Sequence, residues 1–372
     1  MTLVKVRPDA KFRGIVYLFK IVGLASMAYD AENVERPFGP SRIGHCYNVL
    51  LMCALLLPNY YSLAMTYSNV YENQARSEMT ADLIQTAFHL FNGLFVVGYF
   101  SLFQRRSVEL ANRLVAAHRS RPNDDDSSGM RATLRRILIF ELVSLILQLV
   151  TVPKAFIFIV YFVGAVINGL ILNLLLMQYS LVARLLQHGY GSVNSSVCKL
   201  DRDFASLMQH YRLLQQLARD ISDFYSPVML VGFVNLFLNL ILYSYYVLLP
   251  VLTLGREFSC NNVLLVLYCL NYTIFCIVSL FILTSFTTAA VKESQKTGGL
   301  LSLVDRQSLP NVAMLKQLKQ FSSYLLHAPP MSFGVFDLFV IDQTLVVSLV
   351  ASITTYLIIL LQSRGPKDQD CK

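Results

Sequence analysis

Polar side chains recur on one face of the last apolar stretch of the chain. Ser348, Ser352, Thr355, Ile359 and Gln362 are spaced 4, 3, 4 and 3 residues apart, which places all five on one face of a helix. Polar groups in a bilayer must contact protein or water. One interpretation is a polar seam between helices of one subunit. If several copies surround an axis instead, the hydroxyls line an aqueous path, and Ile359 forms an apolar constriction beside a ring of Gln362 amides, which can gate by dewetting.

Three carboxylates lie within or beside apolar runs. Asp337 and Asp342 lie near the start of the last stretch, where they could concentrate cations; ion pairing or contact with lipid headgroups is the alternative. Glu141 lies inside an apolar run, which makes it a functional candidate by default. Its alternatives are a salt link to Arg136 and a water-exposed rim.

A second group of side chains suits a pocket for a small molecule in the outer half of the protein. Most of them combine an aromatic body with a polar tip, which fits a mostly apolar cavity with a few orienting hydrogen bonds. Each also has a simpler interpretation, as a membrane-interface aromatic or a satisfied packing residue. Because acidic residues are few in the spans, a mostly apolar ligand is expected rather than a charged or polyol-like one. The candidates are His89, Gln148, Tyr161, Tyr243, Tyr246 and Tyr268.

Catalytic and cofactor motifs do not emerge from the sequence. It contains no phosphate-binding loop, no G-x-S-x-G, no H-E-x-x-H and no glycine-rich dinucleotide fingerprint. The seven cysteines include no C-x-x-C pair. The sequence therefore predicts neither an enzyme nor a metal or cofactor site.

The composition indicates that lipid is the main solvent of this chain. Its 372 residues are 55% hydrophobic and only 15% charged, far from the balance of a soluble domain with a polar shell. The net charge of +8 could suggest nucleic acid, but the basic residues lie between apolar runs rather than on one soluble domain. Such a distribution encodes membrane topology, so no nucleic-acid partner is predicted.

Seven transmembrane helices follow from the lengths of the apolar runs. A helix rises 1.5 Å per residue and the hydrocarbon core is about 30 Å thick, so one span needs about 20 residues. The run from Ile137 to Leu186 is too long for one crossing, and Pro153-Lys154 is the expected turn because proline breaks the helix. The other spans are Cys46–Thr66, Leu83–Phe103, Val228–Leu252, Val263–Ala289 and Phe336–Leu361.

The orientation follows from the positions of lysine and arginine. With a cytoplasmic N-terminus and an extracellular C-terminus, 25 of the 31 basic residues lie on the cytoplasmic side, where flanking positive charge is retained. The stretch Ile15–Ala25 is expected to be a short helix on the membrane surface, because Lys20 interrupts it and no cleavage site follows.

Two of the predicted cytoplasmic segments have helical periodicity. The first carries an apolar seam on a helix that continues into the fifth span, and the second carries a shorter stripe between Pro310 and Pro329. Packing within one subunit and packing between subunits are both open for these faces. The seam residues are Phe204, Leu207, Tyr211, Leu214, Ala218, Ile221 and Tyr225, and the stripe residues are Leu315, Leu318, Phe321 and Leu325.

The C-terminal stretch resembles a known family. Thr355-Tyr356, five apolar residues and Gln362 are similar to the C-terminal signature of insect gustatory receptors, and the similarity extends upstream through residues 334–336 and 292–298. The family has phenylalanine where this chain has Ser363. Ile359 is therefore the candidate for the apolar constriction.

The resemblance implies a ligand-gated, non-selective cation channel that detects bitter or mostly apolar tastants. It also implies a plasma-membrane protein of chemosensory neurons, surrounded by lipid and assembled as a homotetramer or as a heteromer with other gustatory receptor subunits. Residues 1–333 would form the ligand-sensing bundle and anchor, and residues 334–372 the pore-lining helix and a short extracellular tail. The alternatives are a G-protein-coupled receptor of opposite orientation, an odorant-receptor-like channel subunit and a solute transporter.

Overall fold

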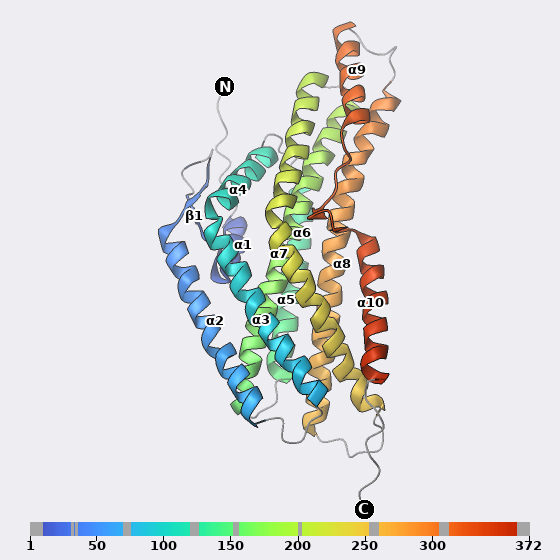
Figure 1. Ribbon diagram of the computed structural model, residues 1–372. Helices are drawn as coiled ribbons and strands as arrows, with labels where there is room; N and C mark the ends of the chain where they lie inside the picture. Colours follow the sequence, from blue (N-terminus) through green and yellow to red (C-terminus); the bar gives the residue numbers. More distant parts are fainter. Residues whose placement is uncertain are drawn as a thin grey trace, which may run out of the picture.

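Helices make up nearly all of the computed structural model, which describes residues 10–30, 33, 36–69, 76–119, 126–151, 156–199, 203–252, 260–304 and 312–362 (Figure 1). Two short antiparallel sheets pair β1 (Met27–Tyr29) with β2 (Phe38–Pro40) and β3 (Gly334–Val335) with β4 (Phe339–Val340). The helices are α1 (Ala10–Ile21), α2 (Arg42–Asn69), α3 (Arg76–Leu102), α4 (Gln104–Arg119), α5 (Asp126–Thr151), α6 (Phe156–Lys199), α7 (Phe204–Leu252), α8 (Cys260–Leu303), α9 (Val312–His327) and α10 (Gln343–Gln362).

Five segments within the described residues are long and apolar enough to cross a membrane. They are Leu83–Leu102, Val166–Cys198, Phe204–Leu248, Val266–Leu303 and Gln343–Gln362, and shorter apolar segments occupy Arg42–Leu57 and Leu138–Thr151. Each predicted span overlaps one of these seven segments. The predicted turn at Pro153-Lys154 lies outside the described residues, between the end of α5 and the start of α6. The all-helical class is thus confirmed, whereas the count of seven crossings and their orientation stay predictions.

The three longest helices extend well beyond the thickness of a bilayer. α6 has 44 residues, α7 has 49 and α8 has 44, which corresponds to lengths of about 66 to 74 Å. Figure 1 shows them side by side, with their upper ends reaching toward α9. α6 lies at the centre and contacts α2, α3, α7 and α8. Its residues 171–177 are all buried, as expected for a helix surrounded by protein.

The predicted seam on α7 is buried within the chain. All seven seam residues are at most 7% exposed, and α7 continues without a break from the seam into the fifth predicted span, as expected. The ring of Tyr211 lies 5.3 Å from that of Tyr190 on α6 and 5.8 Å from that of Phe321 on α9. Of the two open interpretations, packing inside one subunit accounts for this seam, and Leu318 and Phe321 of the α9 stripe are buried there too.

The last helix begins later than the sequence pattern predicted. The span was expected from Phe336, but α10 begins at Gln343 and residues 334–340 form the β3–β4 hairpin. Phe336 and Asp337 have φ values of 48° and 57°, which a helix does not accommodate. Asp342 then caps α10, because its Oδ1 accepts hydrogen bonds from the Thr344 amide at 2.9 Å and the Leu345 amide at 3.3 Å. A local capping role therefore accounts for this carboxylate.

The hairpin is anchored to α7 and α8. Ser222 Oγ of α7 donates a hydrogen bond to the Gly334 carbonyl at 2.8 Å, and Thr287 Oγ1 of α8 donates one to the Ile341 carbonyl at 2.6 Å. Phe233 of α7 packs edge-on against Phe339, with ring centroids 5.3 Å apart. A shift of α7 relative to α8 would therefore displace the start of α10.

Candidate functional site

The polar face of α10 lies on the surface of the single chain. Ser348, Ser352, Thr355, Ile359 and Gln362 are all exposed, and Ile359 is 52% exposed. The opposite face packs on α7 and α8 through Leu345, Val346, Leu349 and Ile353. α10 is apolar and long enough to cross a membrane. Even so, none of its described side chains is fully buried in this chain.

The hydroxyl groups on this face bond to their own helix. Ser348 Oγ donates to the Thr344 carbonyl at 3.1 Å, Ser352 Oγ to the Ser348 carbonyl at 3.0 Å, and Thr355 Oγ1 to the Ala351 carbonyl at 3.0 Å. Back-bonding of this kind satisfies the donors but leaves the oxygen lone pairs available. Gln362, with two donors and one acceptor oxygen in its amide, therefore has the strongest need for water or a polar partner on this face.

Tyr356 of the predicted motif lies at the edge of the packed face. Its ring meets Phe237 of α7 edge-on, with centroids 5.7 Å apart, while 51% of the residue stays exposed. Tyr356 therefore packs partly on a neighbouring helix of the same chain.

A chain of hydrogen bonds joins α3, α7 and α8 inside the bundle. Gln85 Nε2 donates to Asn239 Oδ1 at 3.0 Å, and Asn239 Nδ2 donates to Tyr272 Oη at 3.4 Å. All three residues are at most 4% exposed. The Tyr272 ring lies 4.5 Å from that of Tyr243 and 6.4 Å from that of Tyr268. Aromatic rings and hydrogen-bonded amides thus lie together inside the bundle.

Two further amides in this region have unused hydrogen-bonding capacity. The bonds Gln85–Asn239 and Tyr99–Phe224 fix the register of α3 against α7 and place Asn92 and Asn235 between the two bonded pairs. Both asparagines are at most 1% exposed, and neither amide finds a hydrogen-bond partner within the described part of the chain. Buried polar groups without partners are costly, so water or a ligand is the expected partner here.

The structure brings some of the predicted pocket residues together and separates others. His89, Tyr243 and Tyr268 are buried in the cluster around Asn239 and Tyr272. Gln148 lies elsewhere, on α5 facing α8, where its Nε2 is 3.5 Å from Ser144 Oγ. Tyr246 is only partly buried, and the side chain of Tyr161 lies outside the described residues.

The cluster also contains residues that were not predicted from the sequence. They are Gln85, Asn92, Asn235, Asn239 and Tyr272. A signal was present, because Gln85, His89 and Asn92 are spaced 4 and 3 residues apart and hence share one helix face.

Glu141 belongs to a separate polar stripe between α5 and α8. It is 8% exposed, and its Oε2 has no hydrogen-bond partner among the described residues. Ser144 and Gln148 continue the stripe on α5, and the Ser144 carbonyl accepts a 3.4 Å bond from Asn271 Nδ2 of α8. The alternative of a salt link to Arg136 is not realised in the described structure, where Arg136 is exposed.

Replacing Asn239 by alanine tests the amide chain. The variant should lower the free energy of unfolding by about 1–3 kcal/mol, because the buried Gln85 amide loses its acceptor and the Tyr272 hydroxyl loses a donor. Asn271→Ala is the matched control, since Asn271 is only partly buried and makes one 3.4 Å bond; less than about 1 kcal/mol is expected. Thermal unfolding of the purified protein in detergent compares the two, and equal midpoints would show that the amide chain adds no stability.

The bundle of membrane-length helices defines an all-helical, multi-pass membrane protein. Within this class, the sequence profile described as "7tm Chemosensory receptor" matches residues 12–364. The chain therefore belongs to the 7tm chemosensory receptor family, which confirms the predicted membership among insect chemoreceptors.

Individual relatives agree with this assignment. The chain is 31% identical over 157 residues to the putative gustatory receptor 28b of Drosophila melanogaster, a match that covers 42% of this chain and 33% of that protein. Its fold is similar to that of the insect olfactory receptor OR5 from Machilis hrabei, with a TM-score of 0.69, 13% identity, and coverage of 95% of this chain and 98% of that one. OR5 in complex with eugenol superposes with a TM-score of 0.64, 12% identity and the same coverage.

Proposed function

We propose that this protein is a gustatory receptor that acts as a ligand-gated, non-selective cation channel, with α10 lining the pore. The exposed polar line on α10 carries this proposal. A membrane-length helix that contributes no fully buried side chain to its own subunit, yet presents Ser352, Thr355 and Gln362 on its free face, has the properties of a helix at an axis shared by several copies.

Exposed apolar residues beside the polar line support the same arrangement. Val347 is 70% exposed and Ile358 is 49% exposed, on the flank of α10 next to the polar face. In a ring of subunits this flank would pack against the neighbouring copy while the polar line faces the axis. Four copies in the plasma membrane of a chemosensory neuron are the proposed assembly, as a homotetramer or with other gustatory receptor subunits.

The cluster around Asn239 and Tyr272 is the proposed ligand site. Its aromatic rings favour a mostly apolar ligand, such as a bitter compound, and the buried amides of Asn92 and Asn235 favour one that carries a few hydrogen-bonding groups. Ligand contact with α7 and α8 would move the β3–β4 hairpin anchored on both helices, and with it the start of α10. Residues 1–333 would thus sense the ligand and residues 334–372 would gate.

An odorant-receptor-like role is the second candidate. The fold similarity to the olfactory receptor OR5 covers nearly the whole chain, and one structure of that protein is a complex with eugenol. Calcium imaging of cells that express the receptor, with quinine, caffeine and eugenol applied in turn, compares the two roles.

Single-particle imaging of the purified full-length protein in detergent tests the assembly. Particles with four-fold symmetry and α10 next to the axis are expected. Solitary subunits, or particles with α10 on the outer rim facing detergent, would contradict the pore assignment.

Thiol modification tests which face of α10 meets water. In a Ser352→Cys receptor, a positively charged methanethiosulfonate reagent should reduce cation flux into proteoliposomes by more than half, because the new positive charge lies on the proposed path. The control is Ile353→Cys, one residue further, whose side chain packs toward the core. Equal inhibition of both variants, or of neither, would argue against a wet path along the polar line.

A further inference from the structure

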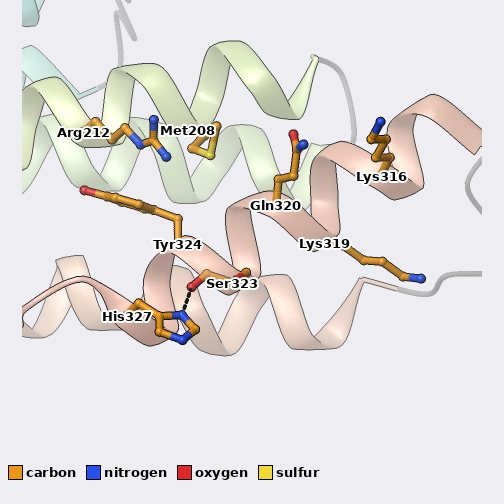
Figure 2. Close-up of a pocket in the computed structure, with 8 residues that line it drawn as sticks. All are labelled: Met208, Arg212, Lys316, Lys319, Gln320, Ser323, Tyr324 and His327. Atoms are coloured by element: carbon orange, nitrogen blue, oxygen red, sulfur yellow. Dashed lines mark hydrogen bonds between the residues drawn. The ribbon is translucent and has the colours of Figure 1, made fainter.

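A basic groove lies between the first turns of α7 and one face of α9, away from the proposed pore and ligand site. Figure 2 shows Met208 and Arg212 on α7 and the other lining residues on α9. The groove has a volume of about 740 Å³ and is shallow, with most of it open to solvent. Lys316, Lys319 and His327 contribute from α9, and none of the eight described lining residues is acidic.

The cations of the groove are not neutralised by any carboxylate among the described residues. In the part of the chain that the structure describes, Arg113 pairs with Glu109 and Asp220, and Lys296 pairs with Glu293. No carboxylate lies within salt-bridge distance of Arg212, Lys316 or Lys319 in the same described part. Three uncompensated cations around one cavity attract a ligand with several negative charges.

The arginine is held in place before any ligand arrives. Its guanidinium carbon lies 4.3 Å from the centroid of the Tyr324 ring, and Figure 2 shows the two side chains facing each other across the groove. Tyr324 Oη donates a 2.5 Å hydrogen bond to Gln215 Oε1, and Gln215 Nε2 donates a 2.7 Å bond to the Pro329 carbonyl. This chain of contacts fixes the ring that supports Arg212, which reduces the entropy lost on binding.

The spread of the charges indicates the kind of anion. Figure 2 shows Lys319 extending away from Arg212, so the positive charges are spread along the groove rather than gathered at one point. Met208 is the one aliphatic side chain among the eight described lining residues, which leaves little to anchor the apolar side chains of a peptide. A compact molecule with several phosphates fits both facts.

The position of the groove favours a soluble source for those phosphates. Arg212 precedes the predicted start of the fifth span, Val228, by 16 residues of continuous helix, or about 24 Å. A lipid headgroup would have to leave the bilayer surface to reach it. We propose that the α7–α9 groove binds a soluble organic polyphosphate on the side of the membrane where α9 lies, which the basic residues predict to be the cytoplasm.

Titration calorimetry with inositol hexakisphosphate tests the groove on the purified full-length receptor at fixed ionic strength. The variant Arg212→Gln/Lys316→Gln/Lys319→Gln should bind at least tenfold more weakly than wild type. The control Arg105→Gln/Arg106→Gln/Arg135→Gln removes the same charge from exposed positions on α4 and α5, and a change below twofold is expected. Gel filtration confirms that both variants are folded. No binding by wild type, or equal weakening in both variants, would overturn the proposal.

A variant without charge change separates the built geometry from diffuse attraction. Tyr324→Leu removes the ring under Arg212 and should weaken binding several-fold. An unchanged affinity in this variant would mean that the groove acts only as a patch of charge, contrary to the proposal.

Nanodiscs distinguish the two sources of phosphate. The affinity for inositol hexakisphosphate should be the same with and without phosphatidylinositol 4,5-bisphosphate in the bilayer. Competition by the lipid would reassign the groove to a lipid headgroup, and stronger competition by polyglutamate than by ATP would reassign it to an acidic protein segment; either outcome overturns the proposal.

Discussion

Receptors with lysine in place of Gln362 should conduct at least about tenfold less cation current than wild type. In the proposed assembly each subunit adds one positive charge to a narrow ring. A unit charge 4 Å from a passing cation costs about 4 kcal/mol at an effective dielectric constant of about 20, and about 1.4 kcal/mol already corresponds to a factor of ten. Gln362→Glu should act in the opposite direction and raise the preference for cations over anions.

Reversal potentials and current amplitudes under asymmetric salt measure both effects. Gln295→Lys is the matched control, because it makes the same change at an exposed position of α8, away from α10. The control should conduct like wild type. Unchanged permeation in both Gln362 variants would remove this residue from the pore and leave the polar line of α10 as an ordinary helix surface.

Alanine at Gly44 should strongly destabilise the fold at the junction of the N-terminal segment with α2. A Cβ atom at this position would lie 2.4 Å from the Ser26 carbonyl oxygen and 2.9 Å from its carbon, both main-chain atoms. Ser26 is restrained from moving away from the added Cβ, because its Oγ donates a 3.1 Å hydrogen bond to the Phe100 carbonyl at the end of α3. Overpacking of this kind costs about 1–3 kcal/mol. The cost should lie near the upper end of this range, because the added Cβ is fixed to one main chain and would meet main-chain atoms of the other.

Gly298→Ala is the control for this substitution. Gly298 lies in α8 with nothing within 4 Å of an added Cβ, so alanine should stabilise the helix there by about 0.5–1 kcal/mol. Thermal unfolding in detergent should therefore shift in opposite directions for the two variants. A Gly44→Ala protein as stable as wild type would show that α2 and the N-terminal segment separate without cost.

The sequence by itself determined the helices and their faces, because helical periodicity is a local property. The seam from Phe204 to Tyr225 was assigned to one helix face from spacing alone. The line from Ser348 to Gln362 shares one exposed face, as its spacing required. The C-terminal motif was enough to name the right family.

The tertiary structure decided which faces meet, because that depends on the rotation and register of one helix against another. It buried the α7 seam inside the subunit, and it delayed the start of α10 to Gln343, since the preceding residues pair as a hairpin held by α7 and α8. The chain from Gln85 through Asn239 to Tyr272 joins residues far apart in sequence, so no spacing rule could link them. The groove beside Arg212 arises in the same way, from a stacking contact between two helices about 110 residues apart in the chain.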